Sequence, residues 1–140
     1  MKVAEQVLAK MLSTDAFSKW MGLEIESMDT GSCRLKFTVT SDMLNGFGIV
    51  HGGIIFAASD SAFAFACNSH GRIAVALDVS ITFTRSATEG DILFVEATEL
   101  HLGHKTSVYQ IKTTNEAGDL VALFKGTAYR TSRNVLEAHP

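Results

Sequence analysis

The chain has 140 residues and a mass of 15.1 kDa, which suits one domain and leaves little room for a second. Its composition, 46% hydrophobic and 19% charged, excludes a disordered chain, and its formal charge of −3 argues against a nucleic-acid-binding surface. Two cysteines without metal or redox spacing favour a reduced, cytoplasmic setting. We expect no signal peptide and no membrane span, because no apolar run reaches the roughly 20 residues that crossing a bilayer requires.

Two short helices are predicted at the start of the chain. Apolar residues at helical spacing over 2–12 predict the first, which is amphipathic. Ser13 or Thr14 is expected to cap the second, which runs through Trp20 and ends at Gly22.

An alternating pattern begins at Leu23 and predicts a β-hairpin. Leu23, Ile25 and Ser27 are expected on one face of the first strand. Turn-forming residues at 29–32 lead to a second strand over 33–40.

The rest of the chain predicts one long helix, over about 51–68, and then four strands. The strands are expected at 73–86, 91–102, 105–115 and 120–131. Short turns between them require antiparallel pairing. The order predicts an α+β fold in which a six-stranded antiparallel sheet wraps around the helix. We expect a single domain over 1–140, with helices in 1–21 and a C-terminal tail over 132–140.

In the first of these four strands, alternate apolar residues from Ile73 to Phe83, Val75 and Leu77 among them, are expected to point one way. The long helix is apolar on nearly every side, so protein should surround it. One sheet of this size cannot cover it completely, and we expect a second copy of the chain to close the rest.

Asp60 is the acidic residue in the middle of this apolar helix. Burying a carboxylate costs free energy and raises its pKa, so its presence needs a reason. One reading is that Asp60 faces solvent or pairs with Arg72 or Lys105; the other is a chemical role. Small residues share its helical face and leave room for another group: Gly53, Ala57, Ala64 and Cys67.

Two polar motifs precede Asp60. His51-Gly52-Gly53 begins the helix, where N–H groups without an intrahelical partner and the helix dipole favour an oxygen that becomes negative. Asn45 adds an amide six residues before His51. A carboxylate, an amide and N–H donors suit attack of water on an acyl carbonyl, although each motif alone also fits a plain turn or cap.

Together these motifs resemble those of the hotdog-fold acyl-CoA thioesterases, in particular the phenylacetate-degradation (PaaI-type) subgroup. The resemblance covers roughly residues 15–130. It is carried by the segments 43–46, 51–53, 59–64, 66–69, 83–85 and 90–91. It implies a homodimer, often a dimer of dimers and hence a homotetramer, with active sites at the dimer interface.

The resemblance also implies a role for each motif residue. Asp60 would be the catalytic carboxylate, acting as nucleophile or as general base. Asn45 would lie near the thioester, and Gly52 would donate its N–H to the thioester carbonyl oxygen. His51 would have a supporting role.

The implied substrate is an acyl-CoA, with hydroxyphenylacetyl-CoA or a medium-chain thioester expected and no metal or redox cofactor. Arg85, Lys105 and Arg130 are candidates for the CoA phosphates, and Gly53 for a further CoA contact; the three cations can equally be ordinary surface charges. The acyl group would meet side chains that can equally be plain core: Phe56, Phe63 and Phe65.

Two positions depart from the family pattern. Ser86 follows Arg85 where family members often have proline, and Ala76 stands where some related thioesterases have an active-site serine. Two other functions stay open: a hotdog enoyl-CoA hydratase, and a non-catalytic acyl-CoA-binding or sensor protein. An assay of enoyl-CoA hydration separates the first, and replacement of Asp60 separates the second.

Overall fold

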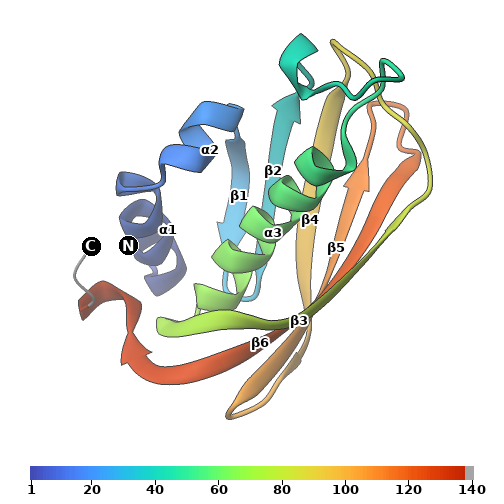
Figure 1. Ribbon diagram of the computed structural model, residues 1–140. Coiled ribbons are helices and arrows are strands. Elements are labelled where there is room, and N and C mark those ends of the chain that lie inside the picture. The colour runs from blue at the N-terminus through green and yellow to red at the C-terminus, as the bar shows by residue number, and fades with distance from the viewer. Residues whose placement is uncertain (138–140) are drawn as a thin grey trace.

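Six antiparallel strands form one curved sheet around helix α3 in the computed structural model, which describes residues 1–137 (Figure 1). The helices are α1 (Val3–Ser13), α2 (Ala16–Met21) and α3 (Gly52–Asn68), with short 3-10 turns η1 (Ser41–Met43) and η2 (Val135–Glu137). The strands are β1 (Glu24–Asp29), β2 (Ser32–Thr38), β3 (Arg72–Phe83), β4 (Ile92–Leu102), β5 (Thr106–Thr114) and β6 (Leu120–Asn134). Their order across the sheet is β1-β2-β4-β5-β6-β3, so β1 and β3 are the edges. The expected α+β fold is confirmed.

The predicted cap of α2 is wrong by one residue. Asp15 is the N-cap, and its carboxylate accepts the N–H of Ser18 at 2.9 Å. Thr14 instead ends α1, and neither Ser13 nor Thr14 caps α2. An ionised carboxylate is a stronger acceptor than a hydroxyl at a helix N-terminus. Gly22 ends α2 in the left-handed conformation, as expected, with φ 72°.

The alternation expected in β1 breaks at a register shift between Ile25 and Ser27. After this bulge Met28 is half-buried and packs on the core, whereas Ser27 is exposed. The prediction that Ser27 shares the face of Ile25 is therefore wrong, because one extra residue in a strand exchanges its two faces.

The same kind of irregularity changes β3, which ends at Phe83 rather than at residue 86. A register shift follows Ala76. Before the shift Ala74 is buried and Val75 is 50% exposed, and Leu77, the residue within the shift, is 61% exposed. The expectation that Val75 and Leu77 share the inner face of the later apolar residues is therefore wrong. As a result, β3 is a long edge strand that carries exposed apolar side chains.

The core lies between α3 and the inner face of the sheet. The ring of Phe63 on α3 packs 5.7 Å from that of Tyr109 on β5 and 5.8 Å from that of Phe124 on β6. At Gly126 an added Cβ would lie 2.7 Å from the Phe63 ring, so only glycine allows this approach. Phe63 and Phe65 are each 1% exposed and are core residues, and each such burial stabilises the fold by about 2 kcal/mol.

The end of the chain departs from the expected tail over 132–140. Strand β6 continues to Asn134, and η2 follows it and packs beside α1, where the Lys10 ammonium donates to the Leu136 carbonyl at 3.2 Å. Residues 138–140 lie outside the described part of the chain. Over the described range 1–137, none of the helices is both long and apolar enough to cross a membrane.

Candidate active site

The N-terminus of α3 is built by His51. Its N–H donates to the carbonyl of Met43 at 2.8 Å, and its side chain Nδ1 accepts the N–H of Gly53 at 2.8 Å. Because Nδ1 is the acceptor, the ring proton sits on Nε2. The N–H of Gly53 is thereby occupied, whereas that of Gly52 has no hydrogen-bond partner within residues 1–137. Gly52 is thus the free donor at this helix end.

Asn45 is held in one orientation by the turn that it starts. Its Oδ1 accepts the N–H of Phe47 at 2.9 Å and that of Ile49 at 3.4 Å. With the oxygen used inside the turn, the amide nitrogen Nδ2 is the end that Asn45 can offer to another molecule.

A cavity of about 420 Å³ joins the two motifs at the N-terminal end of α3. It is lined by Asn45, Ile49, Val50, Gly52, Ile55, Phe83, Thr84, Arg85 and Ser86. The structure therefore brings together three residues predicted from the sequence, Asn45, Gly52 and Arg85. Isoleucine and phenylalanine side chains supply an apolar part of the wall, and Thr84, Arg85 and Ser86 supply a polar part.

Asp60 is half-buried and makes no hydrogen bond or ion pair with the described residues 1–137. Burial raises the pKa of its carboxyl above the ordinary value. The pairing with Arg72 that the sequence left open does not form, since this guanidinium donates to the carbonyls of Thr131 and Arg130. A base with a raised pKa is what proton abstraction near neutral pH requires.

The face of α3 that carries Asp60 is partly open. Gly53, Ala57 and Ala64 are partly or fully exposed along it, as expected, whereas Cys67, further along the same face, is only 2% exposed, so the face is closed at that end. Asp60 lies eight residues after Gly52, or about 12 Å along the helix axis. One chain therefore does not place the carboxylate inside the cavity.

The predicted cations lie at opposite ends of the sheet. Arg85 lines the cavity, with its Nε 3.8 Å from a carboxylate oxygen of Asp119. Arg130 lies opposite Ala74 at the beginning of β3, and its backbone N–H donates to the carbonyl of Lys105. Arg130 and Lys105 therefore lie about 30 Å from the end of β3, where the cavity is. Within one chain only Arg85 is near the site.

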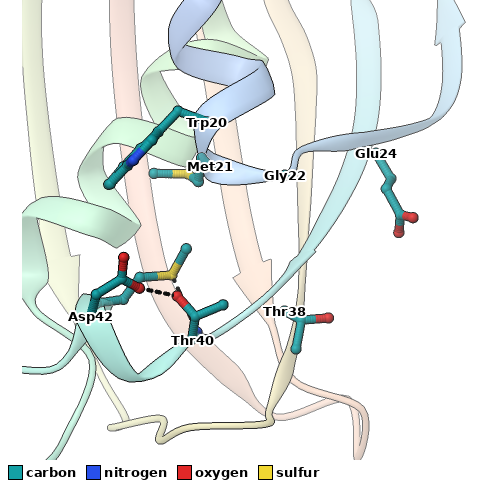
Figure 2. Close-up of a pocket in the computed structure, with 8 residues that line it drawn as sticks. Trp20, Met21, Gly22, Glu24, Thr38, Thr40 and Asp42 are labelled. Atoms are coloured by element: carbon teal, nitrogen blue, oxygen red, sulfur yellow. Dashed lines mark hydrogen bonds between the residues drawn. The ribbon is translucent and has the colours of Figure 1, made fainter.

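A second hollow, of about 370 Å³, lies between α2, the β1–β2 pair and η1 (Figure 2). It is lined by Trp20, Met21, Gly22, Glu24, Thr38, Thr40, Asp42 and Met43. Figure 2 shows Trp20 and Asp42 on opposite sides of it, with the Thr40 hydroxyl donating to the Asp42 carboxylate. It contains none of the predicted site residues, so we assign the site to the cavity beside Gly52.

Sequence reasoning missed the apolar wall of that cavity. Ile49 and Val50 follow the Asn45 turn, and Ile55 lies in the first turn of α3, so adjacency to the motifs was the available signal. The contribution of Phe83 depends on a contact between distant segments. An added Cβ on Gly52 would lie 3.1 Å from the Phe83 ring, so the glycine also makes room for this wall.

Comparisons with known proteins show the family to which this chain belongs. The family model described as "Thioesterase superfamily" matches residues 47–122, more than half of the chain. The chain is 44% identical over 120 residues to the acyl-coenzyme A thioesterase PaaI of Escherichia coli, covering 86% of each sequence. The structure of the E. coli PaaI protein superimposes with a TM-score of 0.92 at 42% identity, over 94% of this chain and 96% of that one.

A Streptococcus mutans protein, smu.793, whose crystal structure contains acetyl CoA, superimposes with a TM-score of 0.78 at 29% identity, over 80% of this chain and 90% of that one. The chain thus belongs to the thioesterase superfamily and has the hotdog fold. Within that class it is PaaI-like, which confirms the resemblance noted in the sequence.

Proposed function

We propose that this protein hydrolyses acyl-CoA thioesters to a free acid and CoA. The observation that carries the proposal is Asp60, an unpaired carboxylate of raised pKa on an open helix face. It is supported by the free donors of Gly52 and Asn45 and by the name of the E. coli relative, an acyl-CoA thioesterase. The acetyl CoA in the S. mutans structure supports the same substrate class.

The residues have distinct roles in this reaction. The N–H of Gly52 and the Nδ2 group of Asn45 donate to the thioester carbonyl oxygen, which becomes negative when the carbonyl carbon is attacked. Asp60 either takes a proton from the attacking water or attacks first itself and forms an anhydride that water opens. In both routes the C–S bond breaks, the sulfur leaves with a proton, and one water is consumed.

We infer that two copies complete each site, because Asp60 and Gly52 of one chain are about 12 Å apart along α3. Antiparallel pairing of the exposed β3 edges would place Asp60 of one copy against Gly52 of the other. The exposed Val75 and Leu77 on β3 support such pairing, and a dimer of dimers is the proposed assembly.

Cys33 and Cys67, both free and buried, support a reduced cytoplasmic setting.

Subunit mixing tests the shared site. Asp60→Asn removes the carboxylate, and Asn45→Asp removes the Nδ2 donor while keeping the oxygen that the turn needs. Each variant alone should be inactive. Random mixing should restore about a quarter of wild-type turnover, because half of the dimers are mixed and one of their two sites is intact. No recovery would show that both groups serve the same copy.

Hydroxyphenylacetyl-CoA or a similar aryl-acetyl thioester is the proposed substrate, and a medium-chain acyl-CoA is the second candidate. An aryl-acetyl substrate would give the protein a role in phenylacetate degradation. The apolar wall of Ile49, Ile55 and Phe83 supports an aromatic acyl group. Arg85 is proposed to meet the CoA phosphates, with Gly53 as a further contact and Lys105 reaching them from the second copy.

A panel of acyl-CoA thioesters, followed by release of the free thiol, tests this function. The aryl-acetyl thioesters should give the highest kcat/KM. Binding without thiol release, or hydration of an enoyl-CoA in its place, would overturn the proposal in favour of a sensor or a hydratase.

A further inference from the structure

Phe47 is the most exposed of the large hydrophobic side chains in the described residues, at 90%. It lies on the turn between Asn45 and Ile49, both of which line the cavity. A phenylalanine in water forgoes the stabilisation of burial, so a ring kept exposed beside a ligand cavity points to an occupant that covers it.

The exposure is not the result of a loose loop. The N–H of Asn45 donates to the carbonyl of Ile49 at 2.8 Å, and the N–H of Gly48 donates to the carbonyl of Asn45 at 3.0 Å. The hydroxyl of Thr88 holds the carbonyl of Gly48 at 3.0 Å. With the two bonds to Asn45 Oδ1, these contacts fix the turn and present Phe47 at its tip.

The space around the backbone on either side of Phe47 in the chain is open. At Gly46 and at Gly48 an added Cβ would meet no atom within 4 Å. The wall next to Phe47 is apolar, because Ile49 is 37% exposed and Phe83, also in the cavity wall, is 49% exposed. The cation Arg85 comes instead from the segment after β3.

We propose that Phe47 determines acyl specificity by packing over the acyl group of the bound thioester, so that it favours aromatic and long apolar acyl groups over short ones. This inference rests on the proposed thioesterase function and names the part of the substrate that the turn recognises. In the proposed reaction Asn45 donates to the thioester carbonyl oxygen, and the ring two residues further along the same fixed turn would then lie beside the acyl group that this carbonyl carries.

The test replaces Phe47 and compares acyl groups. For Phe47→Ala, the ratio of kcat/KM for phenylacetyl-CoA to that for acetyl-CoA should fall about tenfold, the size of one aromatic contact. Phe47→Leu should fall between this variant and the wild type. Both should keep the wild-type Tm, because the ring has few contacts to lose. The control is Trp20→Ala, because Trp20 is an exposed aromatic residue in the other hollow, and this variant should leave the ratio unchanged.

The second measurement is the ratio of the Kd values of two non-hydrolysable thioethers, the analogues of phenylacetyl-CoA and acetyl-CoA. Equal loss for phenylacetyl and acetyl compounds would show that the ring meets the CoA part, and would overturn the specificity role. Unchanged ratios in both assays would also overturn it. Absence of any hydrolysis by the wild-type chain, with a changed ratio of Kd values, would overturn the proposed reaction but support the role of Phe47.

Discussion

At the N-terminal end of α3 the N–H of Gly52 and the amide of Asn45 border an open cavity, whereas at the C-terminal end three polar side chains bond one another. His70 Nε2 lies 2.6 Å from Glu99 Oε1, and the hydroxyl of Tyr109 donates to the same oxygen at 2.6 Å. Within the described residues, these donors thus lack protein partners at the N-terminal end of α3, whereas the polar groups at its C-terminal end are hydrogen-bonded to one another.

Polar groups without a protein partner are the ones proposed to react, whereas the hydrogen-bonded groups hold the helix in place. Free donors and an unpaired carboxylate lower stability, because their loss of water is not offset by partners. The hydrogen bonds among His70, Glu99 and Tyr109 join the end of α3 to β4 and β5, so they fix the helix against the sheet. Substitutions at the first end should change turnover, and those at the second should change stability.

The largest effect is expected for Asp60→Asn. Turnover should fall by about 10³-fold, because the amide can neither accept the proton from water nor attack the thioester. The free energy of unfolding should rise at neutral pH, since the variant avoids burying a charge. Thiol release and thermal unfolding measure the two effects. Asp42→Asn, in the other hollow, is the matched control, and equal rates for wild type and Asp60→Asn would contradict the assignment.

Gly52→Ala should have the next largest effect. Its Cβ would lie 3.1 Å from the Phe83 ring, so the ring and the start of α3 must shift apart by a few tenths of an ångström. The N–H stays but is displaced from the thioester carbonyl oxygen, and we expect kcat to fall by about 100-fold, close to the usual cost of losing one such donor. The control is Gly46→Ala, where the new Cβ has open space, and its kcat should stay near that of the wild type. A similar fall in both would point to the backbone rather than to the donor.

Tyr109→Phe tests the other end of the helix. The buried ring stays in place, but the carboxylate of Glu99 loses one of its two short hydrogen bonds. The free energy of unfolding should fall by about 2 kcal/mol with kcat nearly unchanged. Chemical denaturation measures the first and thiol release the second. Tyr129→Phe, on a tyrosine that is 43% exposed, should change neither.

The smallest effect is a difference in the pH dependence of stability between the paired carboxylate of Glu99 and the unpaired carboxylate of Asp60. Burial tends to raise the pKa of Glu99, but hydrogen bonds from Tyr109 and His70 and the charges of His70 and Arg130 outweigh it and lower the pKa. The stabilisation from Glu99 is therefore present above the ordinary glutamate pKa and is lost as the pH falls through the lowered one. Glu99→Gln should show a shallower loss of stability in acid.

Asp60 has the opposite sign, because its pKa is raised. Its destabilisation is absent below the ordinary aspartate pKa and appears as the pH rises through the raised one. Unfolding of both variants between pH 3 and pH 7 tests this contrast. If Glu99→Gln and Asp60→Asn changed the slope of stability against pH in the same direction, the distinction between the paired and the unpaired carboxylate would be wrong.

The parts predicted well from the sequence are those encoded in short segments. The apolar run of α3, the carboxylate of Asp60 within it and the Gly52 motif at its start are all local, and the structure has α3 where they indicate it. The alternation of the strands also gave the six-stranded sheet, because short turns permit only antiparallel pairing.

The parts that failed depend on contacts between distant segments. The bulges in β1 and β3 are set by pairing with neighbouring strands, so alternation alone misplaced Ser27, Val75 and Leu77. The network of His70 and Glu99 joins residues 29 apart, and nothing near either residue indicates it. The position of Lys105, far from the cavity, likewise follows from sheet order rather than from local sequence.

The edge strand β3 bears on how this protein avoids non-specific pairing with other chains. Main-chain N–H and C=O groups in an open row accept any extended peptide, whatever its sequence. The shift after Ala76 interrupts that row in its middle, so a regular strand can match only half of it at a time. In the proposed β3–β3 pairing the second copy carries the same irregularity, so we expect this edge to pair with another copy in preference to a regular strand.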